Sequence, residues 1–233
     1  MYTEIIIFFI VASVIGYLIQ NLSVRNTRIS KEKIKSFARI KNWQYRHVTG
    51  KSNTGEHIYL SDYTNEWKID IYSFISTSAI TNSVHKEQWI EWSTNKGQLE
   101  NGIAVLGPRL PQKTIKMLNK GKAGIFTNII KRLMFQYTQG MSIDLNHCKL
   151  VERSVEEPLG AVLASEGNEN ALDQYKTLNS LISARKSKNI MYHPIIIRDT
   201  EGIRVRIRGK LNQLKQLEQL YHIGVEITDR NLK

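Results

Sequence analysis

The sequence has very little cysteine and proline. Cys148 is the only cysteine among 233 residues, so no internal disulfide can form, which is typical of a protein in a reducing compartment. A lone cysteine is most often a buried thiol, and the adjacent His147 would point the other way on a strand, which disfavours a nucleophilic pair. The four prolines, without a low-complexity tract or internal repeat, give no obvious interdomain linker.

The motifs of common catalytic and cofactor sites are also missing. Thr49–Ser52 (TGKS) resembles the end of a phosphate-binding loop, but that loop needs a glycine where this chain has Tyr45. The six histidines lack metal-binding spacing, although His47 and His57 could face each other across a hairpin. Nucleophile elbows, nucleotide-binding glycine patterns and paired-carboxylate motifs are absent. We therefore assign no catalytic residue, cofactor or metal ligand, and an enzyme is less favoured than a binding protein.

Charge is absent from Ile5–Ile19 (IIIFFIVASVIGYLI), where eleven of fifteen residues are Ile, Leu, Val or Phe. The run covers only about 22 Å as a helix, whereas the hydrocarbon core of a bilayer is about 30 Å thick. Extending it to Tyr2–Leu22 reaches about 31 Å. A cleaved secretory signal is disfavoured, because Glu4 precedes the run and no Lys or Arg does. A buried core helix is disfavoured by the lack of a polar stripe. The sequence therefore predicts a transmembrane anchor at 1–22.

Basic residues predominate just after this run. Seven of them lie between Gln20 and Lys41, against one acid, Glu32. Lys and Arg near a membrane span stay on the cytoplasmic side. The sequence therefore predicts a single-pass protein of the cell (inner) membrane, with its N-terminus outside and its C-terminal domain in the cytoplasm.

The net charge of +12 is concentrated in three clusters. The first is the group of seven basic residues between Gln20 and Lys41. The second spans Arg109–Arg132, within a stretch from Asn101 to Ile143 that holds no acid. The third surrounds Arg204. Membrane topology and contact with lipids explain the first cluster, whereas each of the other two is either a membrane-surface contact or an ordinary solvated face. For the first and third clusters, the residues that we predict as contacts with the membrane or another anion are Arg25, Arg28, Lys31, Lys33, Lys35, Arg204, Arg206 and Arg208.

Alternating apolar residues and turn residues predict an antiparallel meander in the middle of the chain. The expected strands are Trp43–Val48, His57–Tyr63, Glu66–Ile75, Gln88–Ser93 and Gly102–Gly107. Trp89 and Trp92, three apart, should face opposite sides of their strand, which could leave one of them exposed.

Helical spacing appears on both sides of this meander. We expect helices at Lys31–Lys41, in two short pieces between Pro111 and Leu133, at Asn168–Ala184, and at Leu211–Leu220 ending at Gly224. Further strands are expected at Met141–Val151, Gly160–Ala164, Ile195–Ile197, Ile203–Ile207 and Val225–Thr228.

The predicted fold class is therefore α+β: a single N-terminal transmembrane helix, then a soluble domain with an antiparallel β-meander and several packed helices. The predicted parts are an anchor at 1–22, a basic juxtamembrane stem and helix at 23–42, and a cytoplasmic α+β domain at 43–233. A subdivision of that domain near 108–160 stays open.

The sequence is most consistent with a membrane-tethered binding or accessory module whose basic surfaces face the membrane or an acidic partner. Its expected partners are the lipid bilayer and a protein, either another protein or a second copy at the membrane. The alternatives are a membrane-surface enzyme without a recognisable motif and a nucleic-acid-binding domain, which rests on charge alone.

Overall fold

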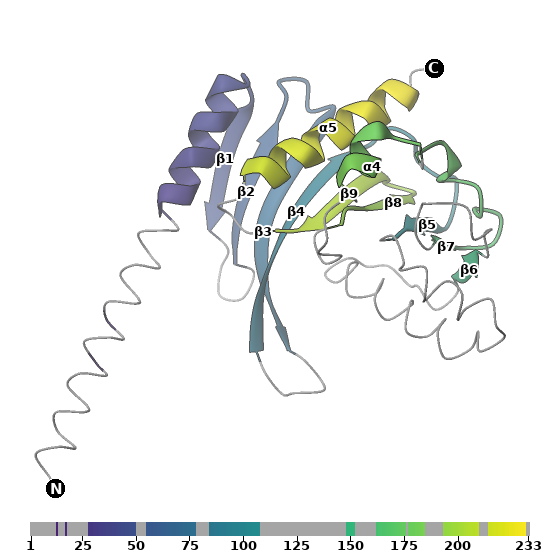
Figure 1. Ribbon diagram of the computed structural model, residues 1–233, viewed down its shortest axis with the longest axis horizontal. Helices are drawn as coiled ribbons and strands as arrows, with labels where there is room; N and C mark the ends of the chain where they lie inside the picture. The colour runs from purple at the N-terminus through teal and green to yellow at the C-terminus, as the bar shows by residue number, and fades with distance from the viewer. Residues whose placement is uncertain are drawn as a thin grey trace, which may run out of the picture.

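Nine strands form one antiparallel sheet, and helices pack against one face of it (Figure 1). The computed structural model describes residues 28–49, 55–77, 84–107, 148–151, 162–175, 177–184, 193–209 and 214–231, together with Ser13 and Tyr17. The strand order is β1-β2-β3-β4-β9-β8-β5-β7-β6, and every pair of neighbours is antiparallel.

The first four strands form the predicted meander. They are β1 (Gln44–Thr49), β2 (Glu56–Ser61), β3 (Trp67–Thr77) and β4 (Val84–Thr94). β3 and β4 are the longest, with eleven residues each, and pair over their whole length. In β2, β3 and β4, two-residue alternation of Ile, Leu or Trp with mostly polar residues gives each strand one face that contributes to the core.

The other five strands extend the sheet from β4. They are β5 (Ile103–Leu106), β6 (Lys149–Val151), β7 (Val162–Ala164), β8 (Ile195–Asp199) and β9 (Gly202–Arg208). The β8–β9 hairpin inserts between the meander and β5, so residues near the end of the chain occupy the middle of the sheet.

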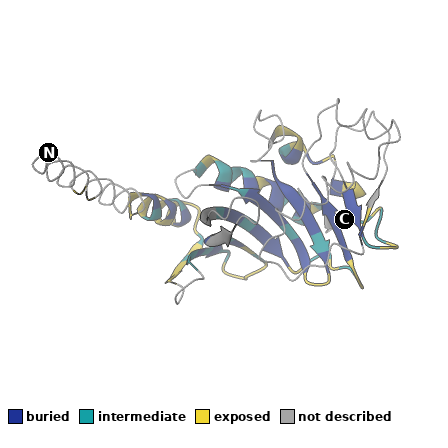
Figure 2. Cartoon of the chain, turned by 90° about the horizontal axis from the view of Figure 1, so that it is seen from below, coloured by how far each residue is buried: buried dark blue, intermediate teal, exposed yellow. Residues whose placement is uncertain are grey.

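One row of directly opposed residues shows how the core crosses the sheet. On β1 to β4 and on β9 its members alternate with mostly polar residues, whereas on β5, β7 and β8 their neighbours are also apolar. All members belong to the main hydrophobic cluster or pack against it. The row runs through Tyr45, Leu60, Ile69, Trp92, Val205, Ile196, Leu106 and Val162. The central strands are accordingly mostly buried (Figure 2).

In the part of the chain that the structure describes, three α-helices cover this apolar face. Residues 28–40 are helical and bury Ile34 and Ala38, while α4 (Asn179–Ala184) buries Leu181. The longest, α5 (Leu214–Asn231), lies over β4 and β9 and contacts α4 (Figure 1). Its buried residues recur every three or four positions, which places them on one side of the helix: Leu217, Leu220, Ile223 and Ile227.

Two elements of the last third differ from the sequence prediction. α5 continues through Gly224, so the predicted strand Val225–Thr228 is helical. The single helix predicted at Asn168–Ala184 is instead a series of turns, the 3-10 helix η1 (Asp173–Tyr175) and the short α4. Glu226 of α5 accepts hydrogen bonds from the backbone N–H groups of Asn179 and Ser180, and so caps α4 from another part of the chain.

The predicted fold class also requires correction at the N-terminus. Within the described residues, no helix combines the length and the apolar character that crossing a bilayer requires. This contradicts the transmembrane anchor at 1–22 and, with it, the single-pass inner-membrane location. The physical weakness of the prediction is length, because fifteen uncharged residues fall short of the hydrocarbon core by about 8 Å. Except for Ser13 and Tyr17, residues 1–22 lie outside the described ranges.

The predicted helices between Pro111 and Leu133, and most of the predicted strand Met141–Val151, also lie outside the described ranges. The predicted domain boundaries at 23–42 and 43–233 stay predictions.

Candidate functional site

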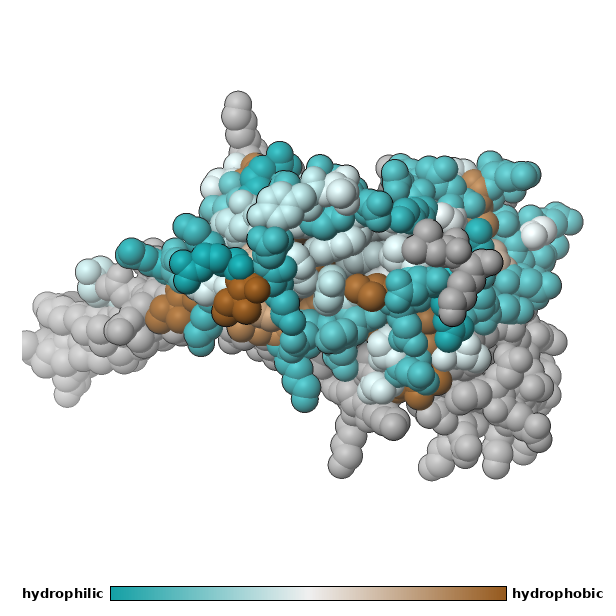
Figure 3. Space-filling view, turned by 90° about the horizontal axis from the view of Figure 1, so that it is seen from above, coloured by the Kyte–Doolittle hydropathy of each residue, from teal (hydrophilic) through white to brown (hydrophobic). Residues whose placement is uncertain are grey.

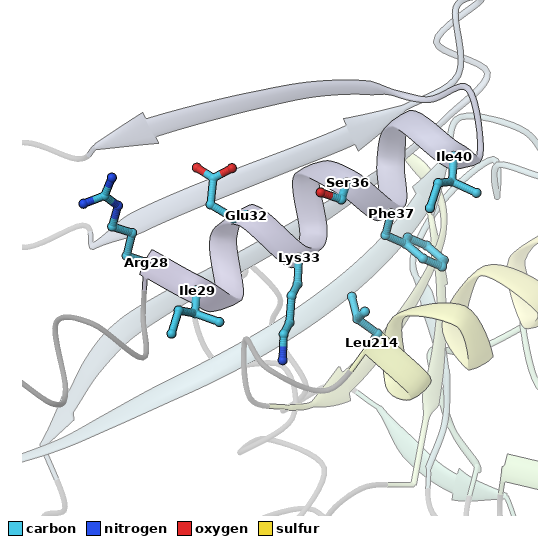
Figure 4. A pocket seen from close by; sticks show the side chains of 8 residues that line it. All are labelled: Arg28, Ile29, Glu32, Lys33, Ser36, Phe37, Ile40 and Leu214. Atoms are coloured by element: carbon cyan, nitrogen blue, oxygen red, sulfur yellow. The ribbon is translucent and has the colours of Figure 1, made fainter.

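An open groove of about 690 Å³ lies between the 28–40 helix and the first residue of α5. Ile29, Phe37 and Ile40 line it from the helix, and Leu214 faces them from α5 (Figure 4). The remaining lining residues are polar or charged: Arg28, Glu32, Lys33 and Ser36. The groove therefore has an apolar floor and a charged border.

The groove side of the 28–40 helix follows a coiled-coil spacing. Ile29, Lys33, Ser36 and Ile40 are separated by four, three and four residues, the pattern of the contact positions in a coiled coil. Ile40 is 78% exposed and Ile29 is 43% exposed. Figure 3 shows hydrophobic side chains gathered at the left-hand end of the described surface, among hydrophilic ones. Two of the four positions are thus exposed isoleucines, and apolar side chains that gather on a surface among polar ones are typical of an interaction site.

The electrostatic surroundings of the groove are positive. Lys31 pairs with Glu56 at 2.7 Å, and Lys41 pairs with Glu218 at 3.6 Å. In the described part of the chain, neither Arg28 nor Lys33 at the border of the groove has an ion pair. The first turn of α5 carries no acid, and the N-terminal end of a helix bears a partial positive charge. A negatively charged partner would therefore be favoured here.

The sheet face opposite α5 carries paired charges. On this face the Nδ1 of His57 lies 3.1 Å from Asp70 Oδ2, and the Nε of Arg206 donates to Glu91 Oε2 at 3.0 Å. A further pair joins Arg204 to Asp199. Most of the charge on this face is thus neutralised by a neighbour.

Aromatic rings and guanidinium groups stack between these charges. The imidazole of His57 lies between Tyr59 and Tyr72, at centroid distances of 5.6 and 5.4 Å and interplanar angles of 14° and 9°. Arg206 lies 5.5 Å from the ring of Tyr72 and 5.1 Å from that of Trp89. The faces of the imidazole are therefore occupied by its two neighbours.

Burial shifts the ionisation of this layer. It raises the pKa of Glu91 to about 7, although Arg204 opposes the shift. It lowers the pKa of Arg206 to about 10, against the effect of Asp70. Burial also raises the pKa of Asp70, while His57 pulls it down. Glu91 can therefore gain or lose a proton near neutral pH.

The predicted contact residues do not form one surface. Arg28 and Lys33 lie at the groove, Lys31 is bound to Glu56, and Lys35 is exposed away from the groove lining. Arg25 lies outside the described ranges.

The arginines of β9 share one face of that strand, as the alternation predicts. Arg206 is 2% exposed and paired with Glu91, whereas Arg204 and Arg208 are half-buried. A membrane or anion contact by these residues stays a prediction.

Two smaller expectations fail, one because of strand register and the other because of burial. His57 is opposite Val48 and His47 is opposite Ile58, so the two histidines lie on opposite faces. Trp89 and Trp92 do face opposite sides, but both are buried, at 2% and 0% exposure.

The groove was not predicted from the sequence. Neither were the two carboxylates of the sheet that form ion pairs, Asp70 with His57 and Glu91 with Arg206. Ile29 and Ile40 lie on the opposite side of the helix from Ile34 and Ala38, and this second apolar stripe was visible in the sequence. Asp70 and Glu91 each stand between two large apolar residues of a strand, a pattern that indicates a carboxylate on the second face of a sheet.

In the described part of the chain, no group of three or more His, Cys, Asp or Glu residues is arranged to hold a metal ion. No family model, curated protein or solved structure matches the chain. Its function is therefore argued from these sites alone.

Proposed function

We propose that this protein is a binding module that takes up an acidic amphipathic helix of a partner protein. The helix would lie in the groove between the 28–40 helix and α5. The observation that carries the proposal is the exposed stripe of Ile29, Lys33, Ser36 and Ile40 beside Leu214.

The shape of the groove favours a helical occupant. The stripe from Ile29 to Ile40 is about 17 Å long, which is about three turns of a helix. A partner with apolar residues at coiled-coil spacing would place them against Ile29, Phe37 and Ile40. The stem of Lys33 can cover apolar surface while its ammonium group stays in water.

The charges select an acidic occupant. Arg28 and Lys33 border the groove on the helix, and the positive end of α5 lies opposite. Among the lining residues that the structure describes, Glu32 is the single acid. A basic helix would meet like charges, so complementarity provides specificity as well as faster association.

A synthetic peptide tests the proposal. It carries Leu at the coiled-coil contact positions and Glu elsewhere, and its binding to the full chain is followed by fluorescence anisotropy. We expect binding that weakens as salt is added. The same peptide with Lys in place of Glu should bind at least tenfold more weakly.

Ile40→Asp provides the matching variant. Because Ile40 is largely exposed, the substitution should leave the fold intact. It removes an apolar contact worth about 1.5–3 kcal/mol, so the peptide affinity should fall roughly 10- to 100-fold. Ile182→Asp on α4, also at an exposed isoleucine but outside the groove lining, is the control and should bind normally.

Equal affinity of Ile40→Asp and the unmodified chain for the acidic peptide would contradict the proposal, as would equal binding of the basic peptide. If the unmodified chain is a dimer and Ile40→Asp is a monomer, the occupant is a second copy instead.

A further inference from the structure

A second cleft, of about 230 Å³, opens at one end of β3, β4 and β9. Lys68, Ser93 and Arg204 line it and stand directly opposite one another on these three strands. They alternate with the core residues Ile69, Trp92 and Val205, so they point to the face opposite α5. The small side chain of Ser93 between two long basic ones leaves the space open.

Two cationic side chains offer donors in this cleft. The Nη2 of Arg204 binds Asp199 and lies 3.2 Å from Oε2 of Glu201. The Nε of Arg204 is buried and has no hydrogen-bond partner among the described residues. Lys68 is exposed and forms no ion pair within the described ranges. A buried donor without a partner carries a cost that a bound carboxylate would relieve.

Acidic side chains line the same cleft. Glu91 and Glu201 lie beside Arg204 in the lining, and Glu66 comes from the turn before β3. The cleft thus presents both signs of charge over a short distance. Its volume equals that of about seven or eight water molecules in the liquid, which matches a molecule of similar heavy-atom count.

We propose that this cleft binds a small zwitterion of the α-amino acid class. The carboxylate would lie between Lys68 and Arg204, and the ammonium group would lie against Glu201, whose side chain is exposed beside Arg204. A dicarboxylate would place its second negative charge on this acid, whereas a simple amine would leave the Arg204 donor unmet. The site is separate from the groove of the proposed function.

Isothermal titration calorimetry of the full chain tests the proposal. The probes are glycine, L-alanine, L-serine and L-glutamine. The controls are succinate, which carries only negative charge, and ethanolamine, which carries only positive charge. We expect saturable one-to-one binding of at least one amino acid, and weaker binding of both controls by tenfold or more.

Variants locate the binding. Lys68→Met changes an exposed side chain and should weaken amino acid binding on the order of tenfold, the effect of losing one charged hydrogen bond. Lys35→Met, at an exposed lysine outside this cleft, should bind like the unmodified chain. Ser93→Leu should fill the cleft and abolish binding, provided that its circular dichroism spectrum shows a folded chain.

The proposal is overturned if no amino acid binds at millimolar concentration or if succinate binds as tightly. It is also overturned if Lys68→Met binds with unchanged affinity, and this result does not depend on whether Ser93→Leu folds.

Discussion

Glu91 and Arg206 form the most deeply buried ion pair in the described part of the chain. Their side chains are 14% and 2% exposed, and the Nε–Oε2 distance is 3.0 Å. Removing two charges from water costs several kcal/mol per ion, and their mutual attraction recovers only part of this cost. The pair is therefore better explained by specificity than by stability, since it fixes the register of β4 against β9.

Glu91 gives the first residue-scale prediction, a dependence of stability on pH. Its pKa rises from 4.5 to about 7 on folding, so between these values the folded state binds more protons than the unfolded state. The free energy of unfolding should therefore fall as pH rises through this range, by at most about 3 kcal/mol. Below about pH 4.5 the contribution of Glu91 is fully present. Urea denaturation at several pH values measures the slope.

Glu91→Gln should remove most of this slope. Well below pH 7 the variant should be about as stable as the unmodified chain, because glutamine resembles the protonated Glu91 that is present there in the folded state. Glu66→Gln is the control, since the Glu66 side chain is 53% exposed and its loss should leave the slope intact. A slope that Glu91→Gln leaves unchanged would show that other groups cause it.

At the residue scale, the sequence revealed types and alternation but not partners. Arg204, Arg206 and Arg208 were correctly placed on one strand face. The ion pairs of these arginines could not be predicted, because the partners come from other strands. Glu91 of β4 pairs with Arg206, and Asp199 of β8 pairs with Arg204. Pairing across strands depends on the sheet order, and local sequence patterns do not contain that order.

Gly224 shows why α5 was misjudged at the element scale. Glycine after a run of helical spacing usually ends a helix, and the following Val, Ile and Thr favour a strand. Here the glycine serves packing: a Cβ at position 224 would overlap the indole ring of Trp92. The burial of Ile223 and Ile227 on the same helix face outweighs local propensity.

Gly224→Ala should therefore destabilise the protein. Replacing glycine within a helix normally gains about 1 kcal/mol, but overpacking against Trp92 costs about 1–3 kcal/mol. We expect a net loss of up to about 2 kcal/mol in the free energy of unfolding, measured by urea denaturation.

Two further variants identify the cause. His222→Ala, at an exposed position of α5, should be nearly neutral. Trp92→Leu makes room for the added methyl group, so the double variant should be less destabilised than the sum of the single ones. A Gly224→Ala protein that is more stable than the unmodified chain would rule out the packing explanation.

The strands of the meander were predictable because their information is local. Alternation and turn residues lie within a few positions of each strand. The start of α4 was not predictable from local sequence. The carboxylate of Glu226 that caps this helix lies 46 or 47 residues further along the chain than the N–H groups that it accepts from.

At the scale of the whole molecule, the sheet separates the two proposed sites. The groove lies on the face covered by α5, whereas Lys68, Ser93 and Arg204 point to the opposite face. The row of core residues from Tyr45 to Val162 lies between them. The groove lining and the cleft lining have no residue in common.

The two sites should therefore act independently. Sites that share no partners usually add within about 0.3–0.5 kcal/mol, which corresponds to about a twofold change in affinity. A saturating amino acid should thus change the affinity for the acidic peptide by no more than about twofold, measured by anisotropy. In the same way, Lys68→Met should leave peptide binding unchanged and Ile40→Asp should leave amino acid binding unchanged. A larger coupling would mean that the sheet has two arrangements that both ligands bias.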